Sequence, residues 1–193
     1  PWWRYGEQAK GKLDFARGYH IEFGGGRRMP QAGWFRGLEP MVDGLYGEAY
    51  KAACRRYYGS LIGFSGRGEM IPNDDCYCEI DPDQKDRFGI PTLRFQWRWS
   101  DHELNQAAHM HRTLKDIIES MGGRMASPFH ENGADAIKKP GEIIHEVGGA
   151  IMGDDASRSV VNEFGQTWEV DNLFLTDGSP FVSNADKNPT LSI

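Results

Sequence analysis

Residues 142–155 read E-I-I-H-E-V-G-G-A-I-M-G-D-D, residues 172–181 read N-L-F-L-T-D-G-S-P-F, and residues 188–193 read N-P-T-L-S-I. The first segment places His145 in a glycine-rich turn ahead of Met152. An amide side chain that can work beside this imidazole, Asn188, directly precedes a proline in the third segment. These three segments decide which fold and which chemistry are expected for the chain.

The pair His145-Glu146 opens like the zinc motif H-E-x-x-H, in which two histidines on one face of a helix bind the metal. The position of the second histidine is occupied by Gly149, and Gly148 and Gly149 both disfavour a helix. We therefore expect no metal site here. For a lone histidine, the ordinary alternative is a structural ring that satisfies backbone groups of the turn.

The three segments, in this order and spacing, resemble the C-terminal end of the glucose-methanol-choline (GMC) flavin oxidoreductases. They are most similar to the sugar-oxidising branch, which holds the gluconate, fructose and glucoside dehydrogenases and pyranose oxidase. The resemblance is specific over 142–193 and weaker but continuous back to Ser60. Family members carry H-x-x-G-T-x-x-M-G, and Gly149 replaces the threonine here, so a contact from that hydroxyl is not expected.

The resemblance implies a role for each matching position. His145 matches the histidine that takes the proton of the substrate hydroxyl, and Asn188 matches a second catalytic position that holds Asn or His in different members. The pair Asp177-Gly178 matches the turn that approaches the ribityl and pyrophosphate part of FAD. The segment Asn188-Pro189-Thr190 matches the one whose backbone amides face the pyrimidine edge of the flavin.

The chemistry of alcohol oxidation agrees with these roles. Removing a hydride from a carbon that carries a hydroxyl requires the hydroxyl proton to leave at about the same time. A neutral imidazole is a suitable acceptor for that proton, and such a base typically contributes about 10²–10⁴-fold in rate. An amide beside it can orient the alcohol oxygen without adding charge, and backbone amides can stabilise an anionic reduced flavin as an oxyanion hole does.

Composition restricts the partners that are expected. The chain has 193 residues, 39% hydrophobic and 26% charged, as in one globular domain with its own core. The net charge is −6 with scattered basic residues, so nucleic acid is not an expected partner. No apolar run is long enough to span a membrane. The three cysteines, Cys54, Cys76 and Cys78, favour buried thiols over a disulfide framework or a zinc site.

The dinucleotide-binding fingerprint is missing from the 193 residues. No G-x-G-x-x-G segment follows a predicted strand, and the glycines at 24–26 and 63–68 lack the required spacing. We therefore interpret the chain as the substrate-side part of a GMC-type FAD enzyme whose nucleotide-binding part lies outside this sequence. In this interpretation residues 1–140 form the substrate-binding region, and residues 141–193 form the catalytic and FAD-contacting segment.

The resemblance also implies partners and a location. The substrate is expected to be a sugar or polyol. A small subunit and an electron acceptor such as a cytochrome c or a quinone are the expected macromolecular and redox partners. A periplasmic or secreted location is favoured over a cytoplasmic one.

Hydrophobic periodicity predicts the elements of the first half. A strand is expected over 18–23, ended by three glycines, and a helix over 39–58. A short buried strand is expected over 59–66, followed by a strand over 76–80 that pairs back and by a polar loop over 81–89.

The second half contains the clearest helix signal. Ser100 and Glu103 form a capping box, which predicts a helix to Met121 that Gly122-Gly123 end. Its apolar residues are expected to face inward: Leu104, Ala107, Ala108, Leu114, Ile117, Ile118 and Met121. A strand is then expected over 124–129 and a loop over 134–140.

Three histidines outside the C-terminal stretch are interpreted without a catalytic role. His20, in the first strand, is expected to be structural. His102 and His109 share one face of the predicted helix, and a solvated polar face is favoured there over a metal site.

Residues 92–99 give the clearest strand, with alternating faces. One face carries Leu93, Phe95, Trp97 and Trp99, and the other carries Thr92, Arg94, Gln96 and Arg98. If the polar face lines a cavity, Arg94 and Gln96 bind sugar hydroxyls; an ordinary solvent-facing strand is an equal alternative. Together the elements predict an α+β fold, a mostly antiparallel sheet covered on one face by helices.

The leading hypothesis is an FAD-dependent dehydrogenase that oxidises a secondary alcohol of a sugar or polyol to a ketone. An oxidase that uses O₂ has the same proton and hydride site, so both stay open. An inactive carbohydrate-binding module of the same fold is a different class, and the presence of both His145 and Asn188 argues against it. A serine hydrolase is disfavoured, because Ser179 does not lie in a G-x-S-x-G motif. The sugar, its reacting hydroxyl, the electron acceptor and the oligomeric state are not determined by these residues.

Overall fold

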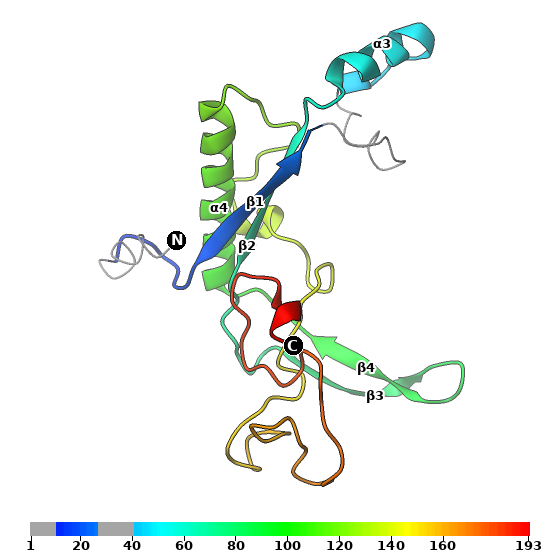
Figure 1. The fold of residues 1–193 in the computed structure, drawn as a ribbon, viewed down its shortest axis with the longest axis vertical. Coiled ribbons are helices and arrows are strands. Elements are labelled where there is room, and N and C mark those ends of the chain that lie inside the picture. The colour runs from blue at the N-terminus through cyan, green and yellow to red at the C-terminus, as the bar shows by residue number, and fades with distance from the viewer. Residues whose placement is uncertain (1–10, 27–40) are drawn as a thin grey trace.

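The computed structural model describes residues 11–26 and 41–193. Figure 1 shows an elongated arrangement in which one long helix lies beside a two-stranded sheet, while a second hairpin and one short helix project outward. The described elements are β1 (Tyr19–Gly25), α3 (Gly47–Tyr57), β2 (Ile62–Gly68), β3 (Tyr77–Lys85), β4 (Pro91–Gln96), α4 (Asp101–Ser120), α5 (Gly133–Ala136) and the 3₁₀ helix η2 (Pro189–Leu191).

The strands form two separate antiparallel pairs. β1 pairs with β2 from Tyr19↔Gly68 to Gly25↔Ile62, and β3 pairs with β4 from Tyr77↔Gln96 to Lys85↔Pro91 with an irregularity after Ile80. The predicted α+β class and antiparallel pairing are therefore confirmed. The prediction of one sheet covered by helices is wrong for the described residues, because β2 and β3 do not pair with each other.

α4 begins and ends as predicted. The Ser100 backbone amide donates to Glu103 Oε2 at 2.8 Å, which makes the capping box, and Gly122 follows the helix with φ +73°. The buried face, however, consists of Glu103, Gln106 and Met110. Met121 was expected to face inward but is 61% exposed.

The β1–β2 sheet packs one of its faces on α4 through glycines. A Cβ atom on Gly66 would lie 1.8 Å from Met110 Sδ, and one on Gly68 would lie 1.7 Å from Gln106 Oε1. Side chains alternate between the two faces of a strand, so the other face carries the neighbours of these glycines. A side chain at either position would therefore displace Met110 or Gln106 from its present place.

His102 and His109 lie under the N-terminal segment, so the expectation of a solvated face is wrong. Their rings lie 6.4 Å and 5.3 Å from the Phe15 ring, centroid to centroid. The Ala16 amide donates to His102 Nδ1, and the Tyr19 hydroxyl lies 2.9 Å from His109 Nδ1. These two rings therefore help to attach residues 14–19 to α4.

The helix predicted over 39–58 is interrupted. Its first two residues lie outside the described ones, residues 41–42 are helical, and α3 starts at Gly47 after a turn that contains Gly44 with φ +72°. None of its residues is buried. Figure 1 shows why: α3 extends away from the rest of the described chain.

Several predicted strands and loops differ from the structure. β2 was expected to be buried but is mostly exposed, and β1 continues into its glycines, as Gly24 pairs with Gly63. The polar loop over 81–89 is largely strand, because β3 runs to Lys85, and β4 ends at Gln96. Residues 124–129 form no strand, and α5 lies within the segment predicted as loop.

The C-terminal stretch has little regular structure but a connected backbone. The Ala150 amide donates to the Ser179 carbonyl at 3.1 Å, and Met152 donates to Pro180 at 2.9 Å. Val161, which is fully buried, lies beneath this region and accepts a hydrogen bond from Gly153. Residues 145–153 and 177–181 are thus held side by side.

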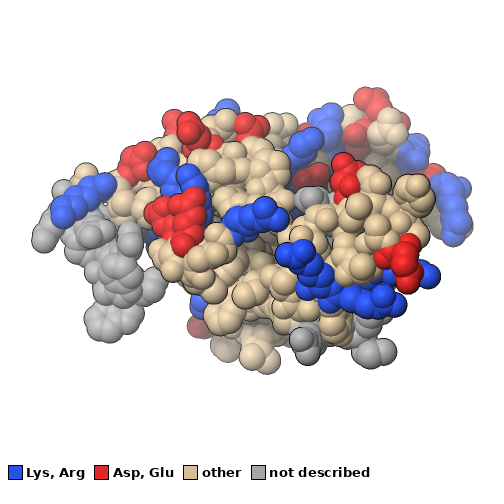
Figure 2. Space-filling model, turned by 90° about the horizontal axis from the view of Figure 1, so that it is seen from above, with Lys and Arg blue, Asp and Glu red and all other residues tan. Residues whose placement is uncertain are grey.

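Among the described helices, none combines the length and the apolar character needed to cross a bilayer. On the face shown in Figure 2, basic and acidic side chains are interspersed. This distribution agrees with the modest net charge of −6.

Candidate active site

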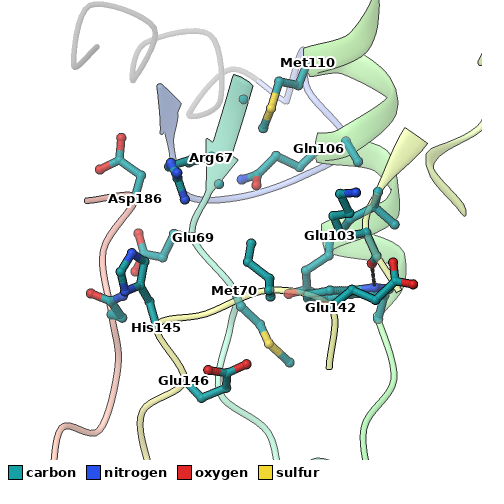
Figure 3. Close-up of a pocket in the computed structure, with 18 of the residues that line it drawn as sticks. Arg67, Glu69, Met70, Glu103, Gln106, Met110, Glu142, His145, Glu146 and Asp186 are labelled. Carbon is teal, nitrogen blue, oxygen red and sulfur yellow. Dashed lines mark hydrogen bonds between the residues drawn. The ribbon is translucent and has the colours of Figure 1, made fainter. Parts of the chain in front are cut away.

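A cavity of about 1260 Å³ opens between α4, the outer edge of β2 and the C-terminal stretch. Both predicted catalytic side chains, His145 and Asn188, line it. Trp97 and Trp99 form part of its wall, as do residues 134–139 after the start of α5. Figure 3 shows His145 on the lower side of this cavity, opposite Gln106 and Met110 of α4.

His145 has an unusual backbone conformation. Its φ is +81°, in the left-handed region that residues with a Cβ rarely adopt. The side chain is half-buried, and among the described residues its ring makes no hydrogen bond to another protein group. A residue held with backbone strain at a cavity, with both ring nitrogens free of partners from the described part of the chain, is suited to act on a bound molecule.

The three segments quoted from the sequence meet at Gly178. A Cβ atom on Gly178 would lie 3.3 Å from the Glu146 carbonyl oxygen, 3.7 Å from Val147 Cγ1 and 3.5 Å from Ile193 Cδ1. Gly178 therefore lies against the residue after His145 and against the end of the third segment. A larger residue at this position would push the His145 turn away.

Asp177 shapes the turn beside Gly178. Its Oδ1 accepts hydrogen bonds from the Ser179 hydroxyl at 2.5 Å and from the Ser179 amide at 2.8 Å. These hydrogen bonds lower the pKa of Asp177 below its ordinary value of 3.8. Asp177 does not line the cavity and is exposed, so it is available to a group that covers this side of the turn.

Asn188 is held in an extended conformation, as expected for a residue before proline. Its φ and ψ are −62° and 121°, and the following Pro189 is buried. The Asn188 side chain is exposed to the cavity and makes no hydrogen bond within the described residues. Thr190, in the short helix η2, is exposed.

The predicted substrate-binding side chains do not line this cavity. Arg94 Nη2 lies 2.6 Å from Glu79 Oε1 across the β3–β4 hairpin, and this hydrogen bond raises the pKa of Arg94. Gln96, at the end of β4, is exposed. A role of Arg94 and Gln96 in sugar binding stays a prediction.

The aromatic residues that follow β4 reach the cavity instead. Trp97 and Trp99 pack edge to face, with ring centroids 5.8 Å apart. Trp99 Nε1 donates to the Lys138 carbonyl at 2.8 Å, whereas Trp97 Nε1 is buried without a hydrogen-bond partner in the described structure. The predicted apolar face is therefore divided: Trp97 and Trp99 line the cavity after the strand has ended, whereas Leu93 and Phe95 are exposed on the hairpin.

Sequence reasoning missed a charged wall of the cavity. Arg67 and Glu69 alternate with the α4-facing glycines of β2, and Asp186 comes from the C-terminal stretch (Figure 3). Glu103, the capping residue, also accepts a hydrogen bond from the Ile71 amide at 3.0 Å. The alternation of glycines with Arg67 and Glu69 along residues 66–69 could have predicted that these two side chains share one face.

Among the described residues, no group of three or more His, Cys, Asp or Glu side chains is arranged to hold a metal ion. The cavity therefore offers hydrogen-bonding and aromatic groups: an imidazole, an amide, an arginine, carboxylates and two indoles. Such a set fits a polyhydroxylated molecule better than an apolar one.

Comparison with known proteins identifies the family of the chain. Residues 72–193 match the family model described as GMC oxidoreductase, for the C-terminal part of these proteins. The chain is 32% identical over 153 residues to the gluconate 2-dehydrogenase flavoprotein of Pantoea cypripedii, covering 75% of this chain and 24% of that protein. It is 30% identical over 148 residues to 2-methyl-1,2-propanediol dehydrogenase of Mycolicibacterium austroafricanum, covering 77% and 26% of the two.

A third relative is the fructose dehydrogenase large subunit of Gluconobacter japonicus. The identity is 28% over 160 residues, which cover 81% of this chain and 27% of the relative. The chain thus spans about a quarter of the length of the curated relatives it matches.

Proposed function

The chain belongs to the GMC oxidoreductase family, and we propose that it forms the substrate side of the active site of an FAD-dependent dehydrogenase. The proposed reaction is the oxidation of a secondary alcohol of a sugar or polyol to a ketone. The observation that supports it most is the presence of His145 and Asn188 in one cavity, both without protein hydrogen-bond partners among the described residues.

His145 accepts the hydroxyl proton of the substrate in this proposal. An imidazole nitrogen that carries no proton takes it as the carbon–hydrogen bond breaks, and typical general bases contribute about 10²–10⁴-fold. Asn188 donates a hydrogen bond from its side-chain amide to the same substrate oxygen and so holds it near His145. Because the amide is neutral, it orients the alcohol without opposing the proton transfer.

FAD, when bound, supplies the hydride acceptor. The residues of this chain that would hold it are Asp177, Gly178, Asn188, Pro189 and Thr190. The donor set fits: the exposed turn at Asp177 lies against the His145 segment through Gly178, and the buried Pro189 fixes the backbone that follows Asn188. Gly178 leaves room for this approach, since a Cβ atom there would make a tight contact of 3.3 Å with the Glu146 carbonyl oxygen.

The cavity wall suggests how a sugar binds. The indole faces of Trp97 and Trp99 can pack on the carbon–hydrogen face of a sugar ring, and the polar side chains of Arg67, Glu69 and Gln106 can bind its hydroxyls. Arg94 and Gln96 remain candidates for a larger substrate that extends along the β3–β4 hairpin.

Electron transfer from the enzyme requires a partner. Since one relative is a large subunit by name, we propose a small subunit and an acceptor such as a cytochrome c or a quinone for this protein. An oxidase that reduces O₂ would use the same substrate residues.

The test uses the protein produced from its full coding sequence, with bound flavin measured by absorbance. His145→Ala should retain the flavin and lower the rate of its reduction by a sugar about 10²–10⁴-fold. His102→Gln, which removes an imidazole that does not line the cavity, is the matched control and should reduce at the wild-type rate. A His145→Ala protein that reduces its flavin as fast as wild type would contradict the assignment. A second measurement separates oxidase from dehydrogenase: the reduced flavin of an oxidase reoxidises faster in air than under argon.

A further inference from the structure

His20 lies between two carboxylates from distant parts of the chain. Its Nδ1 is 3.0 Å from Asp186 Oδ2, and its Nε2 is 3.1 Å from Glu22 Oε1. The other oxygen of Glu22 accepts a hydrogen bond from Arg67 Nε at 2.9 Å. The His20 side chain is 16% exposed, so water does not replace these partners.

This geometry determines the protonation of the ring. A carboxylate has no proton to donate, so each ring nitrogen must donate to the oxygen that faces it. A neutral imidazole has one N–H and would point a lone pair at one of the two carboxylates. Both contacts are therefore satisfied only by the imidazolium form, with a charge that balances part of the negative charge of Glu22 and Asp186.

Asp186 is two residues from Asn188. Within the described structure, the hydrogen bond from His20 is the one that joins residues 182–188 to another element. On the other side of Asn188, Pro189 is buried. Asn188 is thus held between two attachments, an ionic one through Asp186 and an apolar one at Pro189.

We propose that His20, as the imidazolium, is a positioning residue that holds Asn188 at the cavity by binding Asp186. The expected effect on turnover rests on the proposed dehydrogenase function. The sequence pattern alone predicts only a structural role for His20. Residues 20 and 186 come from β1 and the C-terminal stretch, so this contact ties one wall of the cavity to the β1–β2 sheet.

Several charged groups surround His20. Glu22 of the same strand and Asp186 of the C-terminal stretch contact it directly. Arg67 of β2 and Lys187 oppose it, but Arg67 is paired to Glu22 and Lys187 lies 3.4 Å from Asp186. Glu69, next along this face of β2, pairs with Arg17 at 3.7 Å. Hydrogen bonds from His20 and then Arg67 lower the pKa of Glu22, so this carboxylate stays charged.

The experiment has one readout that does not depend on turnover. The rate of trypsin cleavage after Lys187 at pH 7, followed by mass spectrometry, measures how often residues 182–188 leave their position. His20→Gln and Asp186→Asn should each speed this cleavage about tenfold, the low end expected for losing a hydrogen bond between charged groups. Each should also lower kcat about 10–100-fold with the flavin still bound, as expected for a misplaced group.

Two further variants test the pairing and the charge. In His20→Gln/Asp186→Asn, the effects should not add, because both single changes break the same contact. His20→Arg keeps a cation with several N–H donors, so it should be cleaved as slowly as wild type and should recover most of kcat. His102→Gln is the control and should keep the wild-type cleavage rate and kcat.

Unchanged cleavage in both single variants, or additive effects in the double variant, would overturn the proposal. A His20→Arg protein that is cleaved as fast as His20→Gln would overturn the role of the His20 charge. If the wild-type protein oxidises no sugar or polyol, the proposed function fails, while the cleavage rates still decide whether His20 holds the segment.

Discussion

Replacing His145 by glycine and by alanine separates the chemistry of the ring from the conformation of its backbone. The φ of +81° places His145 in the left-handed region. For a residue with a Cβ this conformation costs about 1–2 kcal/mol, and alanine keeps that cost whereas glycine removes it. Glycine in turn makes the unfolded chain more flexible, and this offsets about 0.4–1 kcal/mol of the stability that glycine gains in the folded state. His145→Gly should therefore be more stable than His145→Ala by about 0.5–1 kcal/mol.

Thermal unfolding measures this difference. For a chain of this size, each kcal/mol moves Tm by about 2–4 °C, so the glycine variant should unfold about 1–4 °C above the alanine variant. Both variants should lose the same factor in flavin reduction, since both lack the base. Imidazole added to the buffer should restore part of the rate. An alanine variant that unfolds at the same temperature as the glycine variant, or higher, would refute the idea that the backbone at His145 is strained.

Three further outcomes follow from the geometry. Gly133→Ala should destabilise the fold by about 3 kcal/mol in thermal unfolding, since its Cβ would lie 1.8 Å from a backbone carbonyl oxygen of α4. Gly18→Ala is the control, because its Cβ would meet open space, and it should unfold near the wild-type temperature. Because the pKa of Asp177 is lowered, this carboxylate stabilises the fold at pH values above its ordinary pKa of 3.8. The contribution is lost as the pH falls through the pKa of the folded state. Tm should therefore fall less steeply with decreasing pH in Asp177→Asn than in wild type. Asn188→Ala should lower kcat with the flavin still bound, and Asn188→His should recover part of it in steady-state assays.

The sequence predicted the elements whose signals are local. The capping box at Ser100 and the glycine after α4 set the ends of that helix, because each depends on residues within one turn. Hairpin pairing is less local. β3 extends to Lys85, into the segment predicted as a polar loop, because Lys85 pairs with Pro91 of β4 on the other side of the turn. Nothing in the order of hydrophobic residues says that β2 pairs back to β1.

The faces of strands were the main source of error. The alternation in 92–99 was read correctly, but alternation does not say which partner each face meets. Leu93 and Phe95 are 58% and 68% exposed on the hairpin, while Trp97 reaches the cavity after the strand has ended. The change of direction after Gln96 depends on tertiary contacts that no local pattern encodes.

The candidate site was predictable only in part. The resemblance of the C-terminal stretch placed His145 and Asn188 together, and both line one cavity. The contact between His20 and Asp186 joins residues 166 positions apart, and no motif connects them. Long-range ion pairs of this kind depend on how the elements meet, so they become visible only in three dimensions.

The alternation of β2 also divides its positions for anyone who wishes to redesign the protein. Gly66 and Gly68 face Met110 and Gln106 of α4, so a side chain at either position would displace the end of one of these two side chains. Arg67, between them, points the other way and lines the cavity, but it also pairs with Glu22 beside His20. A library that selects for a new sugar should therefore keep both glycines and vary Arg67 together with Glu22.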